Sequence, residues 1–130
     1  MPIDIDSALG SLPAALALRA RRTELLAANL ANADTPHYKA RDFDFRAAMD
    51  QASQGRVVLA ATEPGHIQPS AGGIDPEVHY RVPLQPSLDG NTVDLPVEQA
   101  KFAENALRYQ ATLTFLNGRI KGLLTAIKGE

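Results

Sequence analysis

The sequence predicts a mainly α-helical protein with long N- and C-terminal helices packed as an antiparallel, coiled-coil-like pair, and a short irregular β-containing middle segment. The composition favours helices, because apolar residues reach 45%, largely through Ala and Leu, while aromatic residues make up only 5%. Apolar residues recur at steps of three and four near both ends of the chain. Proline and glycine concentrate between these two stretches, which excludes long elements there.

The first helix is predicted over about residues 7–33. Its apolar stripe consists of Leu9, Leu12, Leu16, Thr23, Leu26 and Leu30, with Arg19 in the missing turn. Ser7 is the candidate N-cap, and Pro13 indicates either an irregular first turn or a regular helix that begins there. The charged residues of this helix are Arg19, Arg21, Arg22 and Glu24. We favour a solvated helix face for them, and a contact between the arginines and a partner is the alternative.

The middle segment is predicted to contain turns and short strands rather than a core of its own. Six of the nine prolines lie between Pro64 and Pro96, and five of the nine glycines lie between Gly55 and Gly90. The strand candidates are the alternating run 42–46 and the runs 57–60 and 78–82, and residues 47–54 can form a helical turn. Asp42 and Asp44 would share a strand face, where exposure to solvent is a better interpretation than an acid/base pair.

The second long helix is predicted over about residues 96–128. Asp94 is its candidate N-cap, and Pro96 falls in its first turn. Steps of four and three place eight residues in one heptad seam: Phe102, Ala106, Tyr109, Leu113, Leu116, Ile120, Leu123 and Ile127. Another side of this helix carries small residues: Ala103, Ala111, Thr114, Gly118, Gly122 and Thr125. We interpret the two glycines as a site where another backbone approaches closely. The alternative is that they lie in a frayed helix end, where glycine does little harm.

These elements predict two parts. Residues 1–36 and 92–130 together form a helical domain from the two chain ends, and residues 37–91 form the irregular β-containing segment. A two-helix pair of this length buries too little apolar surface to be stable alone, so we expect assembly with other chains.

Several function classes are disfavoured by the sequence. The net charge of −2, with acids and bases interspersed, argues against a nucleic-acid partner. The absence of cysteine removes thiol chemistry, and the spacing of His37, His66 and His79 does not resemble a metal site. No catalytic motif is present, so we expect no enzyme activity and no cofactor. We also find no cleavable signal and no apolar run long enough for a membrane span.

The end of the first helix is the most informative region of the sequence. Asn29 and Asn32 lie on one helix face, and Thr35-Pro36 then directs the chain toward extended geometry. The asparagines are either polar residues tolerated at a helix C-terminus, or buried amides that fix the register of the helix pair or bond a neighbouring subunit. Spacing alone leaves both alternatives open.

Asn29, Asn32, Thr35 and Tyr38 also resemble a known pattern, the Asn-x-x-Asn-x-x-Thr-x-Gly-Tyr string of the rod, hook and filament-type axial proteins of the bacterial flagellum. His37 stands where that family usually has glycine, and histidine adopts a positive φ less readily. Further strings make the chain similar to the basal-body rod proteins in particular: Leu26–Pro36, Tyr38–Phe45, Tyr80–Pro83, Pro86–Asp94 and Phe102–Gln110.

The resemblance implies a structural subunit of the proximal rod that polymerises helically and transmits torque from the motor to the hook. It implies export through the flagellar type III apparatus without a cleaved signal peptide, to a rod that crosses the periplasm. The implied partners are other copies of the chain, rod subunits of the FlgC type, the adaptor FliE and the export gate. A soluble helical adaptor or chaperone that binds a partner through its coiled coil is the alternative.

We expect twelve residues to contribute to subunit packing. They come from the corner, by which we mean the turn that follows the first helix, from the heptad seam and from the two glycines of the second helix. They are Asn29, Asn32, Thr35, Tyr38, Phe102, Tyr109, Leu113, Leu116, Gly118, Ile120, Gly122 and Leu123.

Overall fold

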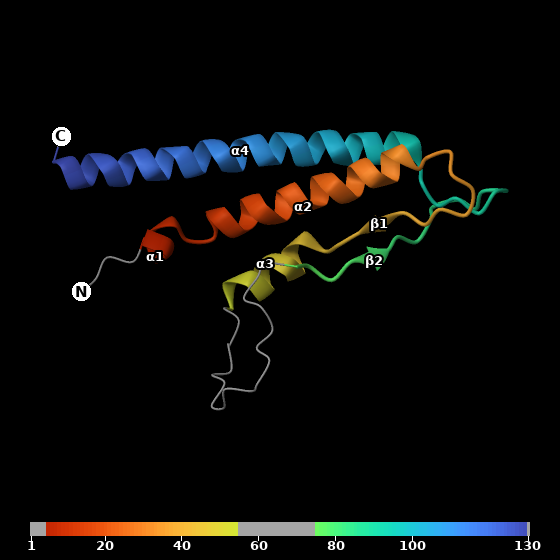
Figure 1. Ribbon diagram of the computed structural model, residues 1–130, viewed down its shortest axis with the longest axis horizontal. Helices are drawn as coiled ribbons and strands as arrows, with labels where there is room; N and C mark the ends of the chain where they lie inside the picture. Colours follow the sequence, from red (N-terminus) through yellow and green to blue (C-terminus); the bar gives the residue numbers. More distant parts are fainter. Residues whose placement is uncertain (1–4, 55–74, 130) are drawn as a thin grey trace, which may run out of the picture.

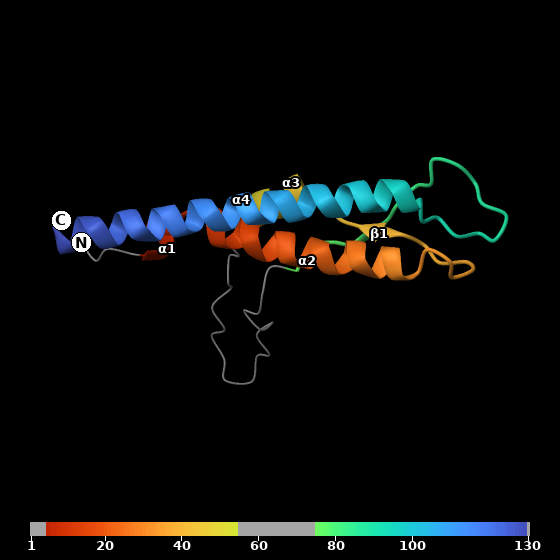
Figure 2. The same ribbon diagram turned by 90° about the horizontal axis from the view of Figure 1, so that it is seen from above.

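The computed structural model describes residues 5–54 and 75–129. Its elements follow the order α1 (Ile5–Leu9), α2 (Leu12–Ala31), β1 (Arg41–Asp42), α3 (Phe45–Ser53), β2 (His79–Tyr80) and α4 (Leu95–Lys128). The two long helices, α2 and α4, lie side by side in both views and run in opposite directions (Figures 1 and 2). The predicted fold class, a mainly helical chain with paired terminal helices and a short β-containing middle, is confirmed.

The N-terminal helix is interrupted between α1 and α2. Gly10 has a φ of +62°, a left-handed conformation that ends α1 at Leu9. Ser7 therefore lies inside α1, and its prediction as the N-cap is wrong. Ser11 occupies the cap of α2 without a side-chain hydrogen bond, and Pro13 lies in the first turn. Of the two alternatives left open for Pro13, the structure supports the second, a regular helix that begins there, because proline fits a first turn but not a helix interior.

The ends of α4 follow local rules. Asp94 caps the helix as predicted, since its carboxylate accepts a hydrogen bond from the Val97 amide at 3.4 Å. Glu98 in the first turn and Lys128 in the last turn both complement the helix dipole. Gly129 follows in a left-handed conformation with a φ of +73°, where glycine carries no steric cost. At 34 residues, α4 spans about 50 Å.

The middle of the chain folds back along α2 as an arm, which we define as residues 40–54 and 75–84. Its two short strands pair antiparallel, with Arg41 opposite Tyr80 and Asp42 opposite His79. In Figure 1, α2 lies between this arm and α4. The strand expected over 42–46 is wrong beyond Asp42, and the helical turn expected over 47–54 belongs to α3, which begins at Phe45. The strand candidate 57–60 lies outside the described residues.

The cause of this difference is Asp44. Its carboxylate accepts hydrogen bonds from the amides of Arg46 at 2.9 Å and Ala47 at 3.2 Å, so it caps α3. The alternation of Phe43 and Phe45 with charged residues resembles a strand, but a capping aspartate in the middle of the run starts a helix instead.

The apolar core lies between α2 and the arm. Leu18 and Leu25 of α2 cluster with Phe43 and Ala48, and partly buried Phe45, Met49 and Val78 pack against them. The middle segment thus shares a core with α2, consistent with the expectation that it has none of its own. By contrast, the buried side chains that α4 contributes are all polar, namely Glu98, Asn105 and Thr112.

Candidate functional site

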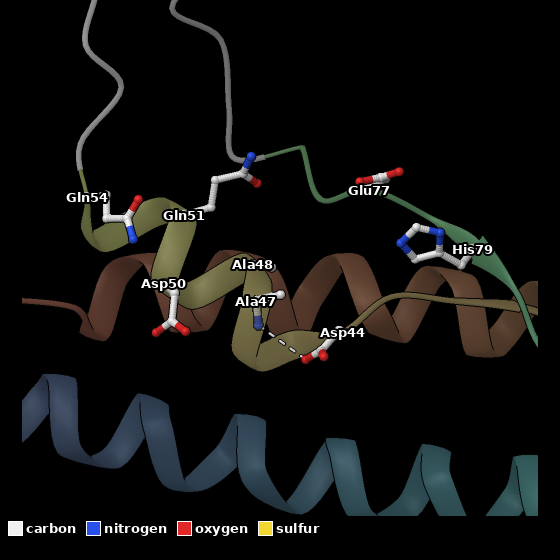
Figure 3. A pocket seen from close by; sticks show the side chains of 8 residues that line it. All are labelled: Asp44, Ala47, Ala48, Asp50, Gln51, Gln54, Glu77 and His79. Carbon is white, nitrogen blue, oxygen red and sulfur yellow. Dashed lines mark hydrogen bonds between the residues drawn. The ribbon is translucent and has the colours of Figure 1, made fainter.

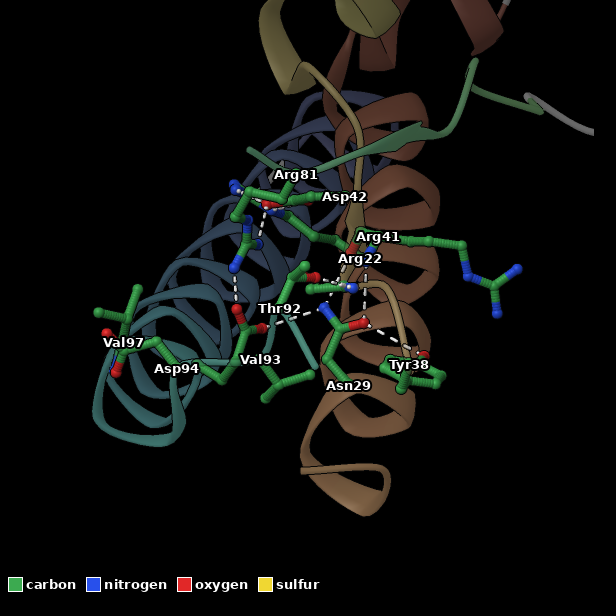
Figure 4. Close-up of polar contacts among 12 residues, drawn as sticks. Arg22, Asn29, Tyr38, Arg41, Asp42, Arg81, Thr92, Val93, Asp94 and Val97 are labelled. Atoms are coloured by element: carbon green, nitrogen blue, oxygen red, sulfur yellow. Dashed lines mark hydrogen bonds and ion pairs between the residues drawn. The ribbon is translucent and has the colours of Figure 1, made fainter. Parts of the chain in front are cut away.

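A chain of alternating charges joins α2, the arm and α4 (Figure 4). Arg22 binds Asp42 through two hydrogen bonds of 3.1 and 2.9 Å. Arg81 donates one hydrogen bond of 2.8 Å to Asp42, and its other terminal nitrogen contacts Glu98. Arg22 and Asp42 were both expected to face solvent, and both expectations are wrong, because each side chain is largely buried against the other.

Asn29 lies at the centre of the same network and is fully buried. Its amide nitrogen donates to the Arg41 carbonyl at 2.8 Å and to Glu98 Oε2 at 3.0 Å. Its amide oxygen accepts from the Arg41 amide at 3.0 Å and from the Tyr38 hydroxyl at 3.3 Å. Asn29 therefore connects α2, β1 and α4, as a buried amide that fixes register does.

The corner after α2 is closed by a residue that the sequence reasoning missed, Asn91. Its amide nitrogen lies 2.8 to 3.0 Å from three carbonyls, those of Asn32, Ala33 and Thr35. Its amide oxygen accepts from the Val93 amide at 2.7 Å. The sequence feature that could have identified Asn91 is its place in an Asp-Gly-Asn turn just before a helix cap, because asparagine in such turns often bonds backbone groups. Asn32 and Thr35 bond locally, to Ala28 and to each other.

His37 adopts the left-handed backbone conformation that glycine adopts most readily. Its φ is +61°, and its amide donates to the Asp89 carbonyl at 3.0 Å. Gly90 faces it with a φ of +74°, and a Cβ built there would lie 2.8 Å from His37 Nδ1. The two residues thus form one close contact between the corner and the turn that precedes α4, and only a residue without a side chain fits opposite the imidazole.

Gly90→Ala is expected to destabilise the protein by about 2 kcal/mol, from left-handed strain and from the contact with the imidazole. In a His37→Gly background the cost of the same substitution falls to about 1 kcal/mol, because only the backbone strain remains. Urea unfolding of the four variants followed by circular dichroism measures both values. Equal costs in the two backgrounds would contradict the role assigned to the imidazole contact.

A second polar layer continues between α2 and α4. Arg19 donates to the Thr112 hydroxyl at 3.2 Å, and its guanidinium lies 4.4 Å from the centre of the Phe45 ring. Asn105 donates to the Arg19 carbonyl at 3.0 Å and to the Thr23 hydroxyl at 2.9 Å. The expectation that Arg19 faces solvent is wrong, since its guanidinium bonds Thr112 and lies over the Phe45 ring. Burial and the charges of Arg108 and Arg22 lower its pKa. Arg21 and Glu24 do form an exposed pair.

The charge chain makes stability depend on pH. Burial alone would raise the pKa of Asp42, but the hydrogen bonds and charge of Arg22, with Phe43 and Arg81, hold that pKa below its ordinary value of 3.8. A carboxylate with a lowered folded-state pKa contributes stability that is present above the unfolded value and is lost as the pH falls through the folded value.

We therefore expect Asp42→Asn to be less stable than the parent protein at about pH 6, and the difference to shrink steadily below about pH 4. Urea unfolding at a series of pH values measures the difference. Asp34→Asn, which changes an exposed carboxylate of the corner, serves as the control. A difference that stays constant down to about pH 2 would show that the ionised form of Asp42 is not the stabilising species.

Much of the surface of α4 is uncovered. Leu107, Phe115, Leu124 and Ile127 are between 50% and 77% exposed. Leu107 and Phe115 lie on the sides of the helix turned away from the half-buried seam, whereas Ile127 continues that seam beyond the part covered by α2. A Cβ added at Gly118 or Gly122 would meet nothing within 4 Å, so within the described chain no backbone approaches them. Of the predicted seam, five residues are half-buried, Phe102, Tyr109, Leu113, Leu116 and Leu123, and three are exposed, Ala106, Ile120 and Ile127.

A shallow hollow lies between α3 and the segment before β2 (Figure 3). Asp44, Asp50, Glu77 and His79 lie around it, but Asp44 is engaged in capping α3. Within residues 5–54 and 75–129, no group of three His, Asp or Glu side chains is arranged to hold a metal ion. His37 lies at the corner, and His66 is outside the described residues.

Comparison with known proteins connects these features to a family. A family model described as flagella basal body rod protein matches residues 13–39, which cover nearly all of α2 and the corner. The chain is 55% identical over 122 residues to the flagellar basal body rod protein FlgB of Cereibacter sphaeroides, covering 94% of both chains. It is 48% identical over 132 residues to FlgB of Escherichia coli, covering 95% of both.

FlgB of Aeromonas hydrophila is 46% identical over 134 residues, which is 100% of this chain and 99% of that protein. None of the helices in residues 5–54 and 75–129 combines the length and apolar character that crossing a membrane requires. With this identity extending over almost its whole length, the chain belongs to the FlgB family of flagellar basal body rod proteins.

Proposed function

We propose that this chain is a structural subunit of the proximal rod, which polymerises helically and transmits torque from the motor to the hook. The observation that carries this proposal is the set of exposed apolar side chains along α4, in a chain of a rod-protein family. Apolar side chains exposed along one long helix are typical of surfaces that pack against other chains. The role is mechanical rather than catalytic, and it requires no cofactor.

The geometry supports polymerisation in an open array. Exposed apolar residues of α4 lie from Leu107 to Ile127, along a helix that α2 and α1 cover on one side only. In the proposed rod this surface packs against a different surface of the next subunit, and heterologous contacts whose rotation does not close produce a helical tube. Gly118 and Gly122 permit close helix packing, which would give the tube torsional stiffness.

The proposal includes the location and partners that the family resemblance implies. The subunit leaves the cell through the flagellar type III apparatus without a cleaved signal peptide and joins a rod across the periplasm. Its neighbours are copies of itself, FlgC-type subunits, FliE and the export gate. Residues 1–36 and 92–130 supply the axial contacts, and residues 37–91 lie outside them. Eleven of the twelve residues expected to pack subunits retain that role in the proposal, whereas Asn29 is buried in its own chain and supports assembly through the fold.

Gly118→Leu tests this function directly. Leucine favours helix by roughly 1 kcal/mol over glycine, so the monomer stays folded while its side chain blocks close approach. We expect normal export, no protein in purified basal bodies and no swimming. Gln110→Leu adds the same side chain at an exposed position of α4 and is expected to swim.

Three measurements read out the result: immunoblots of exported protein, immunoblots of purified basal bodies, and spreading in soft agar. A motile Gly118→Leu strain would overturn the close-packing argument. If the parent protein were missing from basal bodies and copurified with a soluble partner, the adaptor interpretation would replace the rod subunit.

A further inference from the structure

The arm and the helix pair share one buried chain of charges whose members come from separate parts of the fold. Arg22 lies in α2, Asp42 in β1, Arg81 directly after β2, and Glu98 in α4. The Arg81 guanidinium binds both carboxylates, one through each terminal nitrogen. Among these four residues, Arg81 is therefore the one that links the arm to α4. Figure 4 shows Arg81 beside Asp42.

Besides Arg81, two polar contacts tie this region of α4 to the arm: Asn29 of α2 bonds both the Arg41 backbone and Glu98, and the Ala40 amide donates to the Thr92 hydroxyl just before α4. Neither of these contacts supplies a charge to Glu98. The apolar core contains residues of α2 and of the arm but none of α4. The side chains that α4 buries are polar, and Glu98 is completely buried among them. The two strands of the arm pair over only two residues each, which is too short to fix a register by apolar alternation. The ion pairs of Arg81 therefore contribute to fixing the position of the arm relative to α4.

We propose that Arg81 is a positioning residue that couples docking of the arm to the pairing of α2 with α4, so that displacing the arm releases the N-terminal half of α4 in the same step. When the arm leaves, Arg81 leaves with it, and the buried Glu98 loses its cation. An unpaired buried carboxylate is strongly unfavourable, so α4 separates from α2 until water reaches Glu98.

Because of this coupling, a change at the arm would alter the pairing of α2 with α4. Tyr80 and Val82 flank Arg81 in sequence, and their side chains are exposed on the arm. Binding at these side chains that displaces the arm would favour separated helices, because displacement of the arm and separation of α4 from α2 both remove the contact between Arg81 and Glu98. The inference concerns the single chain and does not depend on polymerisation.

Hydrogen exchange of the purified full-length protein, resolved by mass spectrometry, tests the coupling. Phe43→Ala loosens the arm without touching a charge, because Phe43 belongs to the core between the arm and α2. We expect amide exchange to accelerate at least tenfold in residues 45–53 and by a similar factor in residues 98–112. Exchange in 98–112 that stays within twofold of the parent protein would overturn the proposal.

A charge-neutral background shows whether Arg81 is the link. In Arg81→Gln/Glu98→Gln no charge is left unpaired between the arm and α4, so Phe43→Ala should accelerate exchange in residues 45–53 only. The same response of residues 98–112 in both backgrounds would show that the coupling runs elsewhere. Arg41→Gln is the matched control, because the Arg41 side chain is exposed and points away from the network.

Arg81→Gln alone leaves Glu98 unpaired and is expected to accelerate exchange in both segments, whereas Arg41→Gln changes neither by more than twofold. If Arg81→Gln loosened only the arm, the proposal would fail. These outcomes are independent of rod incorporation, so a failed coupling leaves the proposed function intact, and a chain absent from basal bodies leaves the coupling intact.

Discussion

Phe115→Asp is expected to leave the monomer folded and to abolish incorporation into the rod and swimming. Phe115 lies on a side of α4 turned away from the half-buried seam and is 67% exposed, so its replacement changes the stability of the single chain by no more than about 0.5 kcal/mol. In an assembled rod the same position would be covered by a neighbouring helix. An unpaired carboxylate buried there costs about 3–5 kcal/mol per contact, which is enough to prevent a repeated interface from forming.

Immunoblots of purified basal bodies and soft-agar spreading measure this effect, and circular dichroism of the purified variant checks the fold. Gln110→Asp places the same charge at an exposed polar position of α4 and is the matched control. A swimming Phe115→Asp strain would show that this face is not a subunit contact. Leu113→Asp and Leu116→Asp are expected to abolish motility too, but both residues are half-buried, so those variants also destabilise the monomer.

Asn29→Ala is expected to lower the free energy of unfolding by about 3–5 kcal/mol. The substitution removes one hydrogen bond from each of four groups: the Tyr38 hydroxyl, the Arg41 amide, the Arg41 carbonyl and the Glu98 carboxylate, of which Glu98 keeps its contact with Arg81. A folded protein of this size is stable by only about 5–15 kcal/mol, so a loss of this size removes a large share.

Urea unfolding followed by circular dichroism measures the loss. Asn32→Ala is the comparison, with an expected cost of about 1 kcal/mol, because Asn32 bonds the carbonyl of its own helix end and Thr35. Similar costs for the two asparagines would contradict the central place of Asn29. Since Asn29 is buried in its own chain, we expect weaker rod assembly in this variant as a consequence of poorer folding.

The helix boundaries that depend on neighbouring residues could be predicted from the sequence. Asp94 and Pro96 define the start of α4 through a side-chain hydrogen bond and a fixed φ, which act within four residues. The break before α2 was indicated by Pro13, although Gly10 with its positive φ is what ends α1. Asp44 was misread because the same residue type occurs in exposed strands and at helix caps.

The partners of the charged residues could not be predicted in the same way. Arg19 and Arg22 lie on a helix face that, by periodicity alone, resembles a solvated one. Both are covered in the structure, Arg22 by Asp42 of the arm and Arg19 by Thr112 of α4 and the Phe45 ring. Asn91 was found only in the structure, because its three carbonyl partners lie more than 50 residues away in sequence.

By itself the sequence determined the two long helices, the proline-containing corner between the first helix and the arm, and the likeness to flagellar axial proteins, because periodicity, capping and short motifs are local properties. Only the tertiary structure decided how α4 is rotated about its axis toward α2. The buried polar row of Glu98, Asn105 and Thr112 lies directly beside the half-buried apolar seam, and both repeat every seven residues, so periodicity cannot tell which of the two lies deeper against α2. The choice follows from Arg81, Asn29 and Arg19, which reach α4 from distant parts of the chain and satisfy its buried polar groups.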